Sequence, residues 1–335
     1  MKSPESNSAE KLSKLDRREF SWPHSNFKDR ACPFCHTDTH HKVFIRPDNC
    51  RVRVCVNCHT LYVSPAPTES ILNAFYSNYH KDHFGFPSVT VQEFIEVELS
   101  NFDMQSDPRY VYVSKEVKLN KTSKLKVLDF GCGTGSFLLR AQSLGAEVYG
   151  LELDKMAVDF CHQVGLKNVF LGSEDDVEIF GAQFDLIVLN DVIEHILEPE
   201  KLVKKLVANL KVGGKLLIWT PNGEAIMSDD QKIALRVDLE HLQYLSSGSI
   251  ANLCVNNNLY VNHYQQLGFP SEDNFLVKVD KPIGNNELIK SLVWLSKKFY
   301  LFQFVKDLLG RFGFTRQTHS VIGNYHLFCS LVKSK

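Results

Sequence analysis

The chain has 335 residues, of which 44% are hydrophobic and 23% are charged, enough for one large core and a small second module. Its formal net charge is -1, which excludes the bulk positive field that attracts nucleic acids or anionic lipids. No apolar stretch follows the opening MKSPESNSAE, so we expect a cytoplasmic protein whose nine cysteines stay reduced.

The N-terminal part divides into a polar arm and a cysteine-rich module. Residues 1–28 show little hydrophobic periodicity, which predicts a flexible arm. Residues 29–63 contain the pairs CPFC and CVNC, separated by nineteen residues, and this spacing suits a tetrahedral site of four thiolates. We predict a zinc ribbon with a structural Zn²⁺, because so small a module gains little from its own core. The predicted ligands are Cys32, Cys35, Cys55 and Cys58.

Residues 64–121 are predicted to form a linker and lid helices. A helical stretch is expected at about Val91 to Leu99. The run FYSNY in the same region carries Tyr76 and Tyr79. Two interpretations of these tyrosines stay open at this point, namely contact with a substrate and packing in an aromatic core.

Residues 122–335 alternate between strand and helix patterns, which predicts an α/β fold with a doubly wound parallel sheet. Apolar strands are expected at LKVLDF, FDLIVLN and GGKLLIWTPN, and glycines at 145 and 165 are expected to end two helices. Two final strands are expected at NLYVNHYQQLG and YHLFCSLVK.

A helical insertion is predicted at about residues 285–315, before the last strand. Lysines and an aspartate interrupt the apolar stretch from Leu288 to Phe312, so it is too broken to span a bilayer. Amphipathic helices packed on the main domain are the favoured interpretation, and weak contact with a membrane surface is the alternative.

A glycine-rich turn and a later acid predict a nucleoside site. VLDFGCGTG, from Val127 to Gly135, places three glycines where a buried strand turns into a helix, so that a ligand can approach the backbone amides. The spacing disfavours NAD, because Ser136 stands where the dinucleotide fingerprint needs its third glycine. Glu152 ends the second strand, where a carboxylate can accept hydrogen bonds from both ribose hydroxyls of an adenosine.

The order of these motifs, continued through FDLIVLNDVIEHILEP and LKVGGKLLIWTPN, resembles that of class I S-adenosylmethionine-dependent methyltransferases. The resemblance covers about residues 124–265 and implies a seven-stranded Rossmann-like sheet. In this family the glycine loop holds the methionine part, the acid grips the ribose, and an acidic residue after the third strand meets the adenine. The cofactor-binding residues that the resemblance implies are Asp129, Gly131, Cys132, Gly133, Gly135, Glu152, Leu153, Glu174, Asp175 and Asn190.

The ribbon, followed by LYVSPAP and FYSNY, resembles the N-terminal part of bacterial methyltransferases that modify sugars and small metabolites, including nucleotide-sugar C-methyltransferases. In those enzymes the small module lies over the substrate cleft, which implies that Tyr76 and Tyr79 face the substrate. A matching Glu-His pair carries the base there, which implies His241 as base with Glu240 orienting it. His195, in a second Glu-His pair, is expected to bind substrate or to cap the following helix.

The acceptor and the oligomeric state stay open. The C-methyltransferases continue into a second large α/β domain, so an O- or N-methyltransferase acting on a sugar, polysaccharide precursor or secondary metabolite is an equal expectation. One alternative is an RNA or protein methyltransferase that uses the ribbon for recognition, to which Arg46, Arg51 and Arg53 would lend positive charge, although no aromatic-basic stripe favours nucleic acid. Another alternative is a non-catalytic nucleotide-binding partner protein.

Overall fold

The structure is a computed structural model, and it describes residues 26–79, 89–100, 108–119, 124–180, 183–227, 235, 239–269 and 322–334. The chain divides into two units, residues 1–266 with 325–335, and residues 267–324. The fold below is that of the first unit. The helical insertion predicted at 285–315 and most of the N-terminal arm lie outside the described residues.

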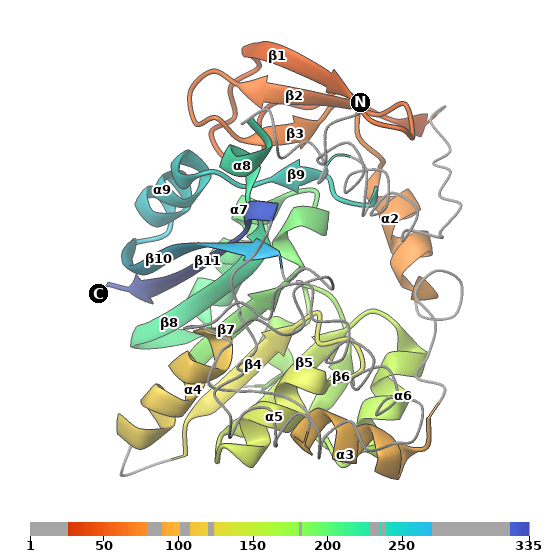
Figure 1. The fold of residues 1–335 in the computed structure, drawn as a ribbon, viewed down its shortest axis with the longest axis vertical. Coiled ribbons are helices and arrows are strands. Elements are labelled where there is room, and N and C mark those ends of the chain that lie inside the picture. The colour runs from red at the N-terminus through yellow and green to blue at the C-terminus, as the bar shows by residue number, and fades with distance from the viewer. Residues whose placement is uncertain are drawn as a thin grey trace, which may run out of the picture. The chain divides into compact units, whose positions relative to one another are not determined.

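The main sheet has seven strands in the order β10-β11-β8-β7-β4-β5-β6 (Figure 1). Neighbouring strands from β8 to β6 run parallel, and β11 pairs antiparallel with β8. The order reverses direction at β4, the switch point at which doubly wound sheets bind ligands. The predicted fold class is confirmed, including the two final strands. The strands are β4 Lys126–Phe130, β5 Glu147–Glu152, β6 Val169–Leu171, β7 Phe184–Asn190, β8 Leu210–Pro221, β10 Leu259–Phe269 and β11 Ile322–Lys333.

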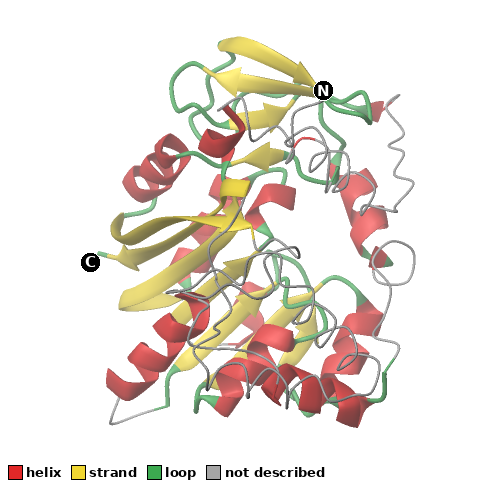
Figure 2. Ribbon diagram, in the orientation of Figure 1, coloured by secondary structure: helices red, strands yellow, loops and turns green. Residues whose placement is uncertain are grey.

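Helices follow or precede most of these strands (Figure 2). The helix expected at Val91 is confirmed as α3, and positive φ angles at Gly145 and Gly165 confirm the two predicted helix ends. The helices are α2 Glu69–Tyr76, α3 Val91–Ser100, α4 Pro108–Leu119, α5 Ser136–Ser143, α6 Lys155–Gln163, α7 Pro199–Ala208, α8 Gly223–Met227 and α9 Ser247–Asn256, with short 3₁₀ turns η3 Val177–Phe180 and η4 Ile193–His195.

The cysteine-rich module forms a second, four-stranded sheet in the order β1-β2-β3-β9. Three strands come from the module itself: β1 His40–Ile45, β2 Arg51–Cys55 and β3 Leu61–Val63. The fourth, β9 Gln243–Tyr244, comes from far along the chain and pairs antiparallel with β3. Sequence reasoning missed this strand, because two residues are too few to show a β pattern.

The module and the main domain share one hydrophobic core. Buried residues of the module, such as Phe34 and Tyr62, pack in the same cluster as Leu128 of β4 and Ile187 of β7. Nowhere in the described part of the chain is a helix long and apolar enough to cross a bilayer.

Candidate functional site

The glycine turn between β4 and α5 is built so that only glycine fits at two positions. Gly131 and Gly135 have φ angles of +74° and +83°, in the left-handed region that glycine favours. A Cβ atom on Gly131 would lie 2.7 Å from Cγ2 of Val192, and one on Gly135 would overlap Cδ1 of Leu166. The backbone of the turn therefore lies against neighbouring side chains on one side, which fixes its path.

Glu152 at the end of β5 faces this turn. Its Oε2 accepts a hydrogen bond from the backbone N–H of Gly133 at 2.8 Å. Its Oε1 accepts from the N–H groups of Leu153 and Asp154 at 2.8 and 3.0 Å. These three bonds hold the carboxylate between the glycine turn and the start of α6. The sequence analysis expects a group that accepts hydrogen bonds from ribose hydroxyls at this position.

Asp129, Asn190 and Arg109 form a polar group behind the turn. Asp129 is only 2% exposed, and burial raises the pKa of its carboxyl to about 8, while Arg109 acts in the opposite direction. Asn190 at the end of β7 donates weakly to Asp129 at 3.5 Å and accepts from Arg109 at 3.4 Å. The Arg109 guanidinium also lies 4.5 Å from the ring centroid of Trp219. Burial of Asp129 thus favours the protonated form of its carboxyl.

The two acids predicted to meet an adenine lie after β6. The carboxylate of Asp175 is 74% exposed and forms an ion pair with Lys205 of α7, which lowers the pKa of Asp175. Glu174 beside it is partly exposed. The pairing of Asp175 directs its carboxylate toward α7, and contact of either acid with an adenine stays a prediction.

A cluster of titratable side chains lies beyond the carboxyl ends of β7 and β8. Glu194, His195 and His241 each bring one side-chain N or O atom within 4.8 Å of the others. The imidazole centroids of His195 and His241 are 4.8 Å apart. Sequence reasoning named both histidines, and the structure brings them together although forty-six positions separate them in the chain.

Two tyrosines of the linker reach the same cluster. The hydroxyl of Tyr76, at the end of α2, lies 2.8 Å from Nδ1 of His195. The hydroxyl of Tyr79 donates to Oε1 of Glu240 at 3.0 Å. The two aromatic rings also contact each other, with centroids 5.5 Å apart. Both interpretations offered by the sequence are therefore compatible with this geometry, because the rings pack while the hydroxyls contact the candidate catalytic groups.

Glu194 is the member of the cluster that sequence reasoning left without a role. Its side chain is fully buried, and Oε2 accepts from the hydroxyl of Thr220 at 2.9 Å. A buried carboxylate beside two imidazoles can stabilise the protonated form of either ring. The signal was available in the repeated Glu-His pair, since Glu194 follows β7 and Thr220 lies at the carboxyl end of the neighbouring parallel strand β8.

The four predicted cysteine ligands converge. Their sulfur atoms all lie within 4.8 Å of one another, with Sγ–Sγ distances of 3.4 Å for Cys32–Cys58 and 3.3 Å for Cys35–Cys55. Tetrahedral Zn²⁺ with bonds of about 2.3 Å separates its sulfurs by about 3.8 Å, so small movements would accommodate the ion. Hydrogen bonds from Cys32 and Thr60 lower the pKa of the Cys58 thiol below its ordinary value. The donor set therefore fits zinc.

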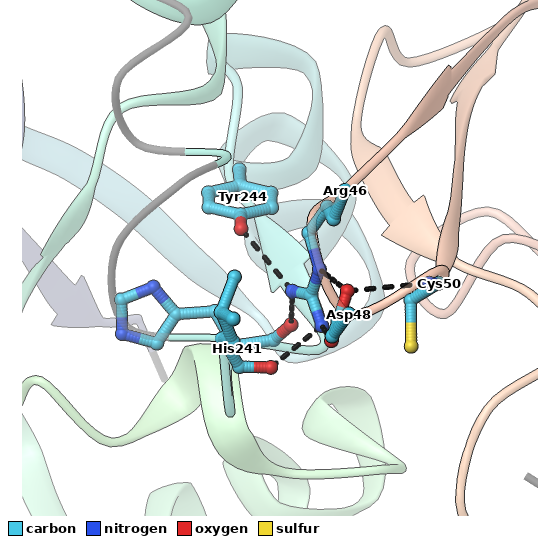
Figure 3. Close-up of polar contacts among 6 residues, drawn as sticks. Arg46, Asp48, Cys50, His241 and Tyr244 are labelled. Carbon is cyan, nitrogen blue, oxygen red and sulfur yellow. Dashed lines mark hydrogen bonds and ion pairs between the residues drawn. The ribbon is translucent and has the colours of Figure 1, made fainter. Parts of the chain in front are cut away.

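The arginines of this module do not form the exposed positive patch considered from the sequence. Arg46 is buried and paired with Asp48, and it contacts the backbone of His241 (Figure 3). Arg53 pairs with Asp29. The side chain of Arg46 thus lies in the interior of the protein. It cannot contribute to a positively charged surface for nucleic acid, as the sequence alone had allowed.

Comparisons with known proteins agree with this geometry. Residues 108–264 match the family described as a methyltransferase domain, so this part of the chain is a methyltransferase domain. The chain is 28% identical over 119 residues to a ubiquinone biosynthesis O-methyltransferase of Coxiella burnetii (strain RSA 493), covering 34% of this chain and 50% of that protein. It is 33% identical over 104 residues to the protein of the same name from Pseudomonas syringae pv. tomato, covering 29% and 44%. The chain thus spans about half the length of the curated relatives it matches.

Solved structures of methyltransferases are also similar to the chain at low identity. Magnesium protoporphyrin IX methyltransferase of Synechocystis with bound S-adenosylhomocysteine aligns with a TM-score of 0.48 at 16% identity, covering 80% of this chain and all of that one. A methyltransferase from Archaeoglobus fulgidus aligns with a TM-score of 0.42 at 15% identity, covering 72% and 99%.

Proposed function

We propose that this protein transfers a methyl group from S-adenosylmethionine to a hydroxylated small molecule. The observation that carries the proposal is the carboxylate of Glu152, which faces the glycine turn at the switch point of the sheet. A doubly wound sheet binds its ligand at this point, and the histidine cluster lies beyond the neighbouring strands of the same edge. Cofactor and acceptor sites would then be adjacent.

In this proposal the cofactor lies along the carboxyl edge of β4 and β5. S-adenosylmethionine supplies a methyl group on a sulfonium, which a nucleophile can displace directly. Glu152 would hold the ribose hydroxyls, and the glycine turn would lie against the methionine part of the cofactor. Asp129 and Asn190 border the methionine end, and Glu174 or Asp175 meets the adenine. Because alignment is the main requirement of a direct displacement, these residues act chiefly by orientation and by exclusion of water.

His241 is the proposed general base. This residue is only 5% exposed, and an imidazole can take the proton that an acceptor hydroxyl loses. Glu240 and His195 would bind the acceptor, and Tyr79 and Tyr76 orient these two groups through the hydrogen bonds described above. Glu194, buried next to both rings, would stabilise the imidazolium formed after proton transfer.

The acceptor class is proposed from the site and from the relatives. Two tyrosine hydroxyls, two imidazoles and a carboxylate surround one small region, which suits an acceptor with several hydroxyl groups, such as a sugar. The relatives named above are O-methyltransferases, which favours oxygen as the methylated atom. Zinc, held by the four cysteines, would have a structural part only, because four thiolates close its coordination shell.

Thermal unfolding with added ligands tests the cofactor part of the proposal. A ligand that binds only the folded state raises the melting temperature, and 100-fold excess over Kd adds about 2.7 kcal/mol to the free energy of unfolding. We expect S-adenosylmethionine and S-adenosylhomocysteine to raise it and NAD to leave it unchanged. A shift with NAD alone would overturn the proposal.

The His241→Ala variant tests the catalytic part. It should bind S-adenosylhomocysteine like the unmodified protein and lose methyl transfer to any hydroxylated acceptor found in a screen of sugars and phenols. Full transfer by this variant would remove His241 as the base and leave the cofactor assignment intact.

A further inference from the structure

Arg46, in the turn between β1 and β2, contacts the segment that carries the proposed base. Its Nη1 donates to the carbonyl of His241 at 2.6 Å and to the hydroxyl of Tyr244 at 3.3 Å. Its Nη2 donates to the carbonyl of Leu239 at 2.6 Å. The two carbonyls belong to the residues before and after Glu240, so one guanidinium holds the main chain on both sides of that residue.

The remaining donors of Arg46 go to Asp48. Nε donates to Oδ1 at 3.1 Å and Nη2 to Oδ2 at 2.6 Å, in the bidentate geometry that arginine and carboxylate favour. All five N–H groups of the guanidinium thereby have an acceptor, and both side chains of the pair are almost fully buried. Lysine, with three donors on a single nitrogen, cannot reproduce this arrangement.

The turn that carries the pair is itself fixed. The N–H of Arg46 donates to the carbonyl of Cys50 at 3.0 Å, and Asn49 adopts a positive φ of 63°. Asp48 also accepts from the N–H of Cys50 at 3.2 Å. The guanidinium therefore comes from a hydrogen-bonded turn of the cysteine-rich module. The turn joins β1 and β2, and the four cysteines lie near the other ends of these two strands.

The strand after His241, β9, pairs with a strand of the cysteine-rich module. Leu61 of β3 pairs with Tyr244, and the N–H of Val63 donates to the carbonyl of Leu242 at 2.7 Å. The N–H of Leu242 in turn donates to the carbonyl of Glu194 at 2.8 Å. The short segment 239–244 is thus held by the cysteine module on one side and by the histidine cluster on the other.

From this geometry we propose that Arg46 is a positioning residue for the acceptor site, and that the cysteine module serves to hold Glu240 and His241 in place. The inference rests on the proposed function, in which His241 is the base. A buried ion pair often adds little stability compared with apolar residues of the same volume. Two of the five hydrogen bonds of Arg46 go to main-chain carbonyls and so fix the position of the backbone, which is what an acceptor site requires.

The test compares three variants in the full chain. Arg46→Met with Asp48→Asn removes both charges at similar volume and keeps an oxygen for the N–H of Cys50. Arg46→Lys keeps the charge but cannot reach both carbonyls. Arg53→Met is the matched control, because it removes the more exposed pair with Asp29 from the same sheet.

The measurements are the hydrogen-exchange rate of the Leu242 amide, the titration of the His241 ring by NMR, zinc content, and S-adenosylhomocysteine affinity. In the double variant and in Arg46→Lys we expect at least tenfold faster exchange and a displaced His241 titration midpoint. Zinc content and S-adenosylhomocysteine affinity should stay within twofold, and Arg53→Met should change nothing.

Unchanged exchange and an unchanged His241 titration in the zinc-bound double variant would overturn the inference. Should the double variant fail to fold, Arg46→Lys decides the question. An unchanged exchange rate of the Leu242 amide and an unchanged His241 titration in Arg46→Lys would show that only the charge matters, and would reject Arg46 as a positioning residue. Failure of the proposed function is distinguishable, since it would appear as absent binding of S-adenosylhomocysteine by the unmodified protein, whereas the exchange and titration need no ligand.

Discussion

Replacing Glu152 by glutamine removes the charge that the proposed cofactor site depends on. The carboxylate offers about four lone-pair positions, and the N–H groups of Gly133, Leu153 and Asp154 occupy three of them. About one position on Oε2 is left for a ribose hydroxyl, and a second opens if the ligand displaces the Gly133 bond. Glutamine has one acceptor oxygen, so it cannot satisfy the N–H groups on both sides and the ribose together.

The expected loss follows from this count. A hydrogen bond to a charged group contributes about 1.5–3 kcal/mol, and each 1.4 kcal/mol is tenfold in affinity, so Glu152→Gln should weaken S-adenosylhomocysteine binding about 10- to 100-fold. Isothermal titration calorimetry measures the loss directly. The same loss is expected for 5′-methylthioadenosine, which keeps the ribose and lacks the amino acid. Glu147→Gln, at the other end of β5, is the matched control and should bind both ligands normally.

Binding by Glu152→Gln within twofold of the unmodified protein would refute the ribose assignment, provided that the variant unfolds at a similar temperature. A loss confined to S-adenosylhomocysteine, with 5′-methylthioadenosine bound normally, would also refute it, because the carboxylate would then act on the amino-acid end of the ligand.

Three further predictions concern stability and metal content. Burial raises the pKa of the Asp129 carboxyl from about 4 when unfolded to about 8 when folded, so its contribution to the free energy of unfolding is complete below pH 4 and is lost as the pH rises from 4 through 8. Asp129→Asn should therefore flatten the fall of melting temperature between pH 4 and 8. Gly135→Ala should lower the melting temperature more than Gly165→Ala, because both have positive φ but only the first Cβ meets neighbouring atoms, and equal losses would count against the clash. Cys35→Ser should reduce zinc from about one ion per chain toward zero and lower the melting temperature, whereas retained zinc would exclude Cys35 as a ligand.

The part of the candidate site that depends on local sequence could be placed from the sequence. The glycine turn and Glu152 lie within one strand-turn-helix-strand unit, so their spacing alone places them on one edge of the sheet. The four cysteines lie in two short sequence motifs, CPFC and CVNC, and a zinc ribbon is formed when two such motifs come together. The main sheet followed from the alternation of apolar strands and amphipathic helices.

For the part of the site that depends on long-range contacts, the sequence indicated which residues to consider but not how they contact one another. The sequence singled out Tyr76, Tyr79, His195 and His241, but no periodicity shows that Tyr76 meets His195 or that Tyr79 meets Glu240. Arg46 was taken as a surface charge, because an arginine is usually exposed and the acceptors that bury it are backbone carbonyls 193 and 195 positions away. Backbone acceptors leave no trace in the identity of a residue.

The proposed cofactor site and the proposed acceptor site should respond differently to loss of zinc. The glycine turn and Glu152 are held by hydrogen bonds within residues 131–154, so the proposed cofactor site is stabilised by short-range contacts. The segment 239–244 is held by β3 and by Arg46, so the proposed acceptor site depends on the cysteine module. Because closing a long loop costs chain entropy that only the module's contacts offset, removing the metal should loosen the acceptor site first. After partial loss of zinc we therefore expect a protein that still binds its cofactor but no longer holds His241 in position.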